Sequence, residues 1–107
     1  MGKEVVDAAI RIHSDLGPGL LEPVYEVVLA NELESRGLAV ERQVKVSTNY
    51  RGITSDDGFR ADILIESKVI LELKSLEQMN KVHYKQLLTY LRLRRMKLGF
   101  LLNLAQT

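Results

Sequence analysis

The chain has 107 residues, of which 46% are hydrophobic and 27% charged, and its formal net charge is +1. This length suits one domain with one core, so we expect a single domain over residues 1–107. The absence of cysteine excludes a disulfide framework, a zinc ribbon and a thiolate nucleophile. No apolar run approaches the roughly 20 residues of a membrane span, and the first residues lack the apolar block of a signal peptide. We therefore expect a cytoplasmic protein without a membrane segment.

Two helices are predicted in the first third of the chain. The first apolar stripe has helical spacing and ends at a Gly-Pro-Gly break; its members are Val5, Ala9, Ile12 and Leu16. A second apolar stripe predicts a helix from about Leu20 to Arg36. Gly37 follows where a left-handed cap residue would end that helix.

From residue 38 the apolar period changes to two, which predicts strands. Alternation over 38–46 indicates a half-buried strand. We expect a turn at Thr48-Asn49, a short strand over Tyr50–Ile53 and a turn at Asp57-Gly58. Two further strands follow, at Phe59–Ile65 and Val69–Ser75.

Helical spacing returns from about Gln78 to Met96, and a last apolar run over Phe100–Leu104 predicts a closing strand. The order is therefore α-α-β-β-β-β-α-β. Because the chain ends strand-helix-strand, a parallel crossover is appended to an antiparallel meander. The predicted class is α/β, on the border with α+β, with a mixed sheet flanked by helices.

Three polar residues interrupt the two predicted strands around residues 59–75, namely Asp62, Glu72 and Lys74. If Glu66-Ser67-Lys68 forms a three-residue loop, Ile65 lies opposite Val69, and the same register sets Asp62 opposite Glu72. The two carboxylates would then lie roughly 5 Å apart at their Cβ atoms. Lys74 lies on the same face of the sheet, two residues further along.

Two carboxylates on adjacent strands repel each other unless a cation or a proton lies between them. Oxygen ligands with open water positions suit Mg²⁺ or Mn²⁺, and a lysine beside such an ion can orient a water or stabilise charge on a phosphate. The alternative interpretation is a cross-strand salt bridge from Asp62 or Glu72 to Lys74. On the preceding helix, Glu22 and Glu26 are four residues apart, so either can face the sheet.

Asp62, nine intervening residues and Glu72-Leu73-Lys74 resemble the bipartite signature of the PD-(D/E)xK nuclease superfamily, with Ala61 in the place of the usual proline. The segment from Gln86 to Tyr90 resembles the QxxxY motif of its RecB-type members. Upstream, the segment from Gly19 to Tyr25 is similar to the namesake motif of the GxxExxY family, which is assigned to this superfamily. The resemblance implies a restriction-endonuclease-like core.

The resemblance also implies roles for individual residues. Asp62, Glu72 and the backbone carbonyl of Leu73 would bind a divalent metal, Mg²⁺ or Mn²⁺, and Lys74 would position the attacking water. An acid on the first core helix often completes such a site, and Glu22 is the preferred match, with Glu26 as the alternative. Gln86 and Tyr90 would line the site from the second core helix.

Residues 80–107 carry six basic and no acidic side chains, of which Arg92, Arg94, Arg95 and Lys97 are candidates for contacts with a nucleic-acid backbone. The leading hypothesis is a Mg²⁺-dependent nuclease that cleaves phosphodiester bonds in DNA, or secondarily in RNA. One alternative is a non-catalytic binding or assembly module with the nuclease fold, for which a homodimer is the default arrangement. Another is metal-independent binding of nucleic acid through the basic helix.

Overall fold

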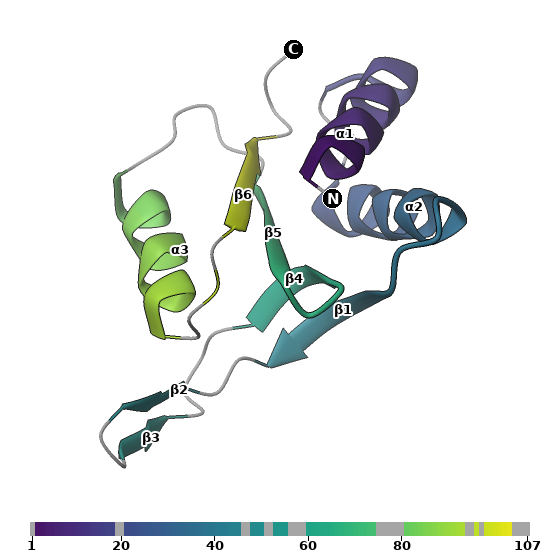
Figure 1. Cartoon of the computed structure of the whole chain (residues 1–107). Coiled ribbons are helices and arrows are strands. Elements are labelled where there is room, and N and C mark those ends of the chain that lie inside the picture. The colour runs from purple at the N-terminus through teal and green to yellow at the C-terminus, as the bar shows by residue number, and fades with distance from the viewer. Residues whose placement is uncertain are drawn as a thin grey trace.

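The computed structural model describes residues 2–18, 21–45, 48–50, 53–55, 60–74, 81–93, 96 and 98–103. Helices and strands form the predicted mixed α+β architecture (Figure 1). In chain order they are α1 (Gly2–Leu16), α2 (Glu22–Ser35), β1 (Val40–Lys45), β2 (Thr48–Tyr50), β3 (Ile53–Ser55), β4 (Arg60–Ile65), β5 (Val69–Lys74), α3 (Lys81–Leu93) and β6 (Leu98–Asn103). None of the helices described is long and apolar enough to cross a bilayer.

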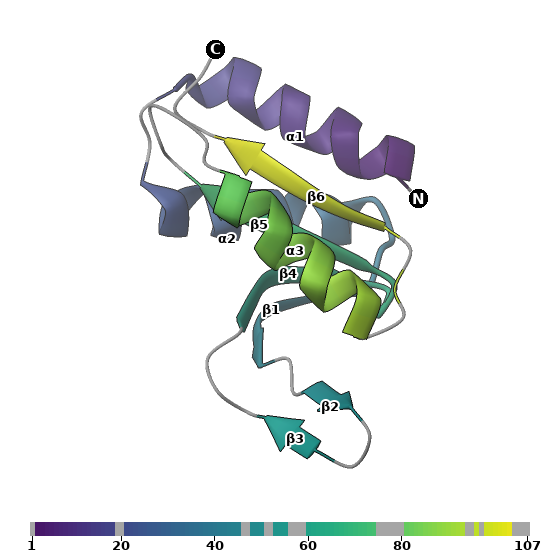
Figure 2. The same cartoon turned by 90° about the vertical axis from the view of Figure 1, so that its left-hand side faces the viewer.

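The main sheet has four strands in the order β1-β4-β5-β6. β1 pairs with β4 and β4 with β5 in antiparallel fashion, whereas β6 runs parallel to β5. The chain passes from β5 through α3 to β6, so the predicted parallel crossover is confirmed. Figure 2 shows β5 and β6 side by side with α3 lying across the sheet.

The turn between β4 and β5 sets the register of the central strands. Its residues Glu66 and Ser67 both have φ of 53°, and the Lys68 N–H donates to the Ile65 carbonyl at 2.9 Å. Ile65 then lies opposite Val69, and the next pairs are Leu64–Ile70 and Ile63–Leu71. This is the register predicted from a three-residue loop.

Helices cover both faces of the sheet, and each face has its own apolar cluster (Figure 1). α1 and α2 pack on one face, where Tyr25, Leu29 and Leu33 of α2 meet Ile63 and Leu71 of the sheet. α3 covers the other face with a smaller cluster of Ala61, Ile70 and Leu87. β5 lies between these layers, so its first five residues are all buried, as expected for a strand covered on both sides.

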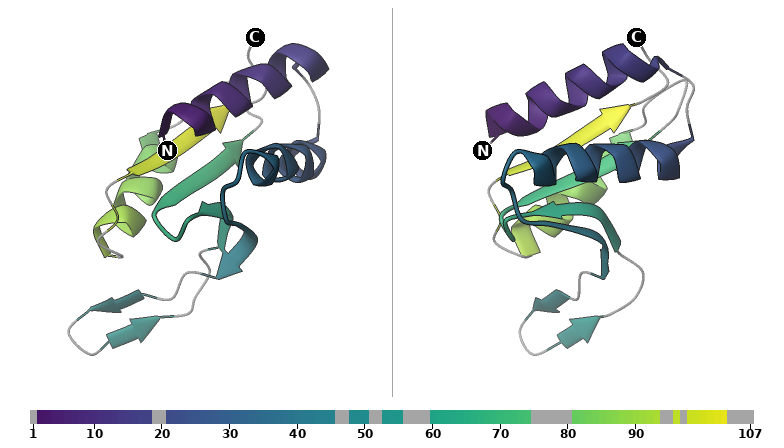
Figure 3. Two further views of the ribbon diagram at one scale, coloured as in Figure 1. Left: turned by 45° about the vertical axis from the view of Figure 1, so that its right-hand side comes forward. Right: turned by 90° about the vertical axis from the view of Figure 1, so that its right-hand side faces the viewer.

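The segment after β1 differs from the prediction. A single short strand over Tyr50–Ile53 is wrong, because Tyr50 pairs with Ile53 across a hairpin and the two residues belong to β2 and β3. Thr48 and Asn49 lie in β2 and not in a turn. Two residues separate Tyr50 from Ile53, the spacing of a tight hairpin. Figure 3 shows this hairpin extending away from the four-stranded sheet; the predicted Asp57-Gly58 turn lies outside the described residues.

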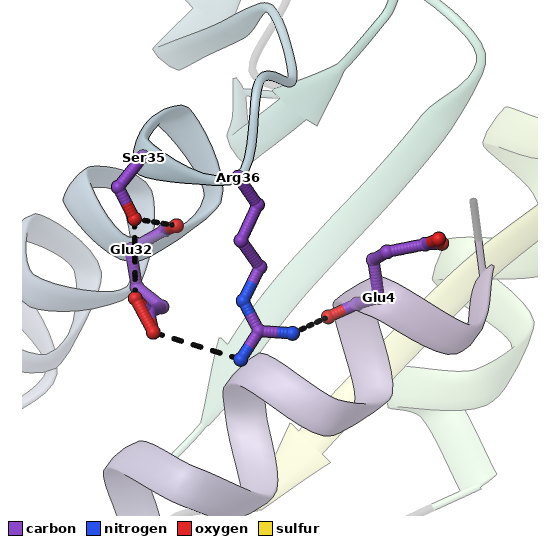
Figure 4. A network of polar contacts seen from close by, with 4 residues as sticks. All are labelled: Glu4, Glu32, Ser35 and Arg36. Atoms are coloured by element: carbon purple, nitrogen blue, oxygen red, sulfur yellow. Dashed lines mark hydrogen bonds and ion pairs between the residues drawn. The ribbon is translucent and has the colours of Figure 1, made fainter.

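Polar contacts join the beginning of α1 to the end of α2 (Figure 4). Arg36 donates to the Glu4 carbonyl at 3.3 Å and forms an ion pair with Glu32 at 3.6 Å. Ser35 Oγ donates to the Glu32 carbonyl at 2.7 Å. Gly37 then has φ of 87°, so the predicted left-handed cap of α2 is confirmed. These contacts lie at the surface, so the packing of the two helices comes mainly from their buried side chains.

We expect Leu71→Ala to lower the free energy of unfolding by about 2–5 kcal/mol, because Leu71 is fully buried in the central strand and its removal leaves a cavity. Ile10→Ala is the control, since Ile10 of α1 is 60% exposed and should change stability by about 0.5 kcal/mol or less. Urea unfolding of both variants measures the difference. Equal losses would contradict the central place of β5 in the core.

Candidate metal and catalytic site

Asp62 and Glu72 meet where the regular pairing of β4 and β5 ends. The paired positions stop at Ile63–Leu71, and the next residues outward are Asp62 and Glu72. Asp62 Oδ2 accepts a hydrogen bond from the Leu73 backbone N–H at 2.8 Å. The Asp62 carboxylate on β4 thus accepts a hydrogen bond from the backbone of β5. This bond holds Asp62 beside the Glu72-Leu73-Lys74 segment.

Glu72 is a buried acid whose carboxyl group is not fully hydrogen-bonded. It is 6% exposed, and its Oε1 atom is buried without a hydrogen-bond partner. Burial raises the pKa of Glu72 to about 8, and the negative charge of Asp62 adds to the rise. The Asp62 backbone N–H and the Lys74 ammonium lower this pKa in part. A proton or a cation is therefore the natural partner of the acidic pair.

A cavity of about 500 Å³ opens beside this pair. It lies between the first half of α2, the middle of β1 and β4 and the end of β5, and six of its eight lining residues are polar. The residues that line it are Glu22, Pro23, Glu26, Arg42, Gln43, Asp62, Leu73 and Lys74. Four of the predicted site residues therefore share one cavity, namely Glu22, Asp62, Leu73 and Lys74.

The two candidate acids of α2 have different surroundings. Glu22 is exposed in the first turn, whereas Glu26 is 5% exposed. Arg42 Nε donates to Glu26 Oε2 at 3.1 Å and Arg42 Nη2 forms an ion pair with the same oxygen at 3.1 Å. Gln43 Nε2 donates to Glu26 Oε1 at 2.6 Å. Both oxygens of Glu26 are thus engaged by protein groups. This arrangement favours Glu22 over Glu26 as the acid that faces a ligand.

Arg42 and Gln43 are the cavity residues that the sequence did not indicate. Both lie in β1, where alternation of polar and apolar residues predicts a half-buried strand and nothing more. Gln43 has φ of 52°, in the left-handed region, and its Nε2 atom is 3.4 Å from Asp62 Oδ1. No periodicity or motif in the sequence signals this conformation.

The remaining predicted residues belong to α3 and the segment after it. Gln86 and Arg92 are exposed, and neither lines the cavity. Tyr90 is part of α3, but its side chain lies outside the described part of the structure. Arg94, Arg95 and Lys97 also lie outside the described residues. The roles predicted for these residues stay predictions.

The donor chemistry of the cavity fits a hard divalent cation. Asp62 and Glu72 supply carboxylate oxygens, and the buried Oε1 of Glu72 has no protein partner. Across the parts of the chain that the structure describes, no three His, Cys, Asp or Glu side chains are grouped closely enough to hold a metal ion. Glu22 and Asp62 line the cavity, whereas Glu72 is buried next to Asp62 and does not line it. Glu22 therefore does not complete a three-acid cluster with the pair.

The fold and the site together define an α+β domain with two acids and a lysine on adjacent central strands. A family model described as the PD-(D/E)XK nuclease superfamily matches residues 1–107. The chain belongs to this superfamily, as the sequence motif predicted. No curated protein and no solved structure gives a significant match. The similarity to the GxxExxY family stays a prediction.

The raised pKa of Glu72 predicts a pH-dependent effect of Glu72→Gln on stability. The pKa rises from 4.5 in the unfolded chain to about 8 in the folded one, so folding favours the protonated acid. Stability therefore falls as the pH rises from 4.5 to 8. Since Gln resembles the protonated acid, we expect the variant to be more stable than the wild type above pH 8, by about 5 kcal/mol.

Urea unfolding with a chelator present, at about pH 5, 7 and 9, measures this difference. It should grow with pH and approach zero at the acidic end. Glu34→Gln is the matched control, because it makes the same change at an exposed acid of α2. A difference in the free energy of unfolding between Glu72→Gln and the wild type that stays constant with pH would show that Glu72 does not titrate as described.

Proposed function

We propose that this protein is a metal-dependent nuclease that hydrolyses phosphodiester bonds in DNA, or secondarily in RNA. The observation that carries the proposal is the convergence of Asp62 and Glu72, with the unpartnered Glu72 Oε1 buried and Lys74 in the adjoining cavity. Membership of the PD-(D/E)XK nuclease superfamily supports it independently.

Asp62, Glu72 and the backbone carbonyl of Leu73 would hold the ion, and Glu22 would contribute from α2. All four groups supply oxygen, which suits Mg²⁺ or Mn²⁺ better than zinc. A bound divalent ion would supply electrostatic stabilisation of the negative charge that develops on the phosphate. The acidic pair would bind the ion, while Lys74 stays beside it at the end of β5.

Lys74 is the residue that we assign to the attacking water. It is the last residue of β5, it is half-buried, and it lines the cavity with Asp62. Its ammonium carries three donors and can orient a water next to the phosphate while it attracts the anionic substrate. The sheet fixes its backbone through the pairing of Lys74 with Asn103 of β6.

Contacts with the nucleic acid would come from the basic end of the chain. Arg92 is exposed at the end of α3, and the described part of this helix carries Lys81 and Lys85 but no acid. We assign Arg92, Arg94, Arg95 and Lys97 to the phosphate backbone, where such residues bind without reading sequence. Gln86 and Tyr90 would flank the substrate from the same helix.

Plasmid and single-stranded DNA incubated with Mg²⁺ or Mn²⁺ test this function directly. We expect cleavage by the wild type and a loss of at least about a hundredfold for Lys74→Ala, because the water loses its positioning group. Lys68→Ala is the matched control, since Lys68 is an exposed lysine of the β4–β5 turn and should keep full activity. Cleavage that persists at the wild-type rate in Lys74→Ala would end the proposal.

Calorimetric titration with Mn²⁺ separates the nuclease from a non-catalytic module. We expect the wild type to bind Mn²⁺ and Asp62→Asn to bind it far more weakly, since one of two anionic ligands becomes neutral. Asp15→Asn, which changes an exposed acid of α1, should bind as the wild type does. Equal affinities for Asp62→Asn and the wild type would instead favour the module.

A second candidate function, self-assembly as a dimer, is favoured by aliphatic side chains exposed around α2. Leu21 is 72% exposed, Val24 47% and Val27 48%, although helix surfaces of this kind are usually polar. A dimer through this surface is compatible with nuclease activity. Light scattering measures the molecular mass of the wild type and of Val24→Asp in solution and so tests whether this surface forms a dimer. A charge at a buried interface should convert the dimer to a monomer.

A further inference from the structure

Gln43 bridges the one acid of α2 that is buried and the proposed metal ligand of β4. Its Nε2 atom donates to Glu26 Oε1 at 2.6 Å and lies 3.4 Å from Asp62 Oδ1. A carboxylate accepts hydrogen bonds but cannot donate them, so the amide nitrogen of Gln43 must face both acids. The shorter bond anchors the amide, and the longer one reaches the oxygen of Asp62 that the Leu73 N–H does not occupy.

Glu26, which accepts the shorter hydrogen bond of Gln43, is itself held in place by Arg42. Arg42 Nε donates a hydrogen bond to Glu26 Oε2 and Arg42 Nη2 forms an ion pair with the same oxygen, and the Glu26 side chain is 7% exposed. Charge-assisted hydrogen bonds are stronger than neutral ones, and a low local dielectric around a buried partner such as Glu26 strengthens them further. Glu26 therefore has a fixed position, with one oxygen given to Arg42 and the other to Gln43.

The backbone of Gln43 has an unfavourable conformation at the point where its side chain contacts both acids. In the pairing of β1 with β4, Arg42 lies opposite Ile63 and Val44 opposite Ala61, so Gln43 lies opposite Asp62. Gln43 has φ of 52°, which residues other than Gly, Asn and Asp rarely adopt. Unfavourable backbone conformations persist where the surrounding structure enforces them, and they concentrate at functional sites.

We infer that Gln43 is a positioning residue that orients the Asp62 carboxylate for metal binding, with Glu26 and Arg42 as its support. The inference rests on the proposed function, since it concerns the same site. It assigns Glu26 to the support of Asp62 and not to the metal itself. Groups that orient metal ligands in this way typically change metal affinity 10–100-fold when they are removed.

Gln43→Asn tests the inference without changing the charge of the site. Asn tolerates the left-handed backbone, but its side chain is one methylene shorter and cannot span from Glu26 to Asp62. We expect the Mn²⁺ affinity of the full-length chain, measured by calorimetry, to fall about tenfold or more. The melting temperature measured with a chelator should stay the same or rise, because Asn adopts this conformation at lower cost.

Gln43→Gly provides a second, independent variant, since it removes the amide and also relieves the backbone. It should show the same loss of Mn²⁺ affinity without loss of stability. A side chain with a merely structural role would lower stability when it is truncated and would leave metal affinity unchanged. A loss of metal affinity without a loss of stability therefore identifies Gln43 as a residue that positions Asp62. Asn31→Ala is the control, because it removes an exposed amide of α2 outside the cavity.

Each outcome has a definite meaning. Affinities of both Gln43 variants within twofold of the wild type, in a protein whose Mn²⁺ binding depends on Asp62, would overturn the positioning role and leave the nuclease proposal standing. A wild-type protein that binds no Mn²⁺ would overturn both. In the cleavage assay, we expect both variants to lower kcat with little change in KM, because the substrate contacts of the basic end are unaltered.

Discussion

The register between β4 and β5 is the constraint on which the core and the site both depend. The turn of Glu66, Ser67 and Lys68 sets Ile65 opposite Val69, and every residue further along the two strands follows from that pair. A slip by one residue would turn Ile63 and Leu71 out of the core and separate Asp62 from Glu72 in the same step. Selection of the correct apolar rows during folding therefore also assembles the acidic pair.

The acidic pair costs stability in the folded protein. A buried carboxyl group without a cation is stabilised by taking up a proton, which is the physical meaning of the raised pKa of Glu72. The more usual solution for a central strand is an apolar residue at this position, and β5 has apolar residues at its other four buried positions. An unfavourable acid in an otherwise apolar strand indicates a position retained for binding.

Apart from one short strand, the order of elements could be predicted, as could the parallel crossover and the β4–β5 register, because apolar periodicity and the length of one turn determine them. The β2–β3 hairpin could not, since strands of three residues are too short for alternation to show. Arg42 and Gln43, which contact Glu26, could not be predicted as site residues for a different reason. Their contacts join residues 16 and 17 positions apart and require a left-handed residue within a strand, and no local pattern encodes either feature.

The fold supplies the rigidity that such a site needs from elements far from its chemistry. Leu29 and Leu33 of α2 pack against the sheet, and the glycine cap at Gly37 returns the chain directly into β1. α2 and β1 are thereby held together, which brings Glu26 within reach of Arg42 and Gln43. On either side of Gln43, pairing with β4 holds the strand in place. If Asp62 binds a metal as proposed, its orientation through helix and strand, and not through a loop, would position it before any ion arrives.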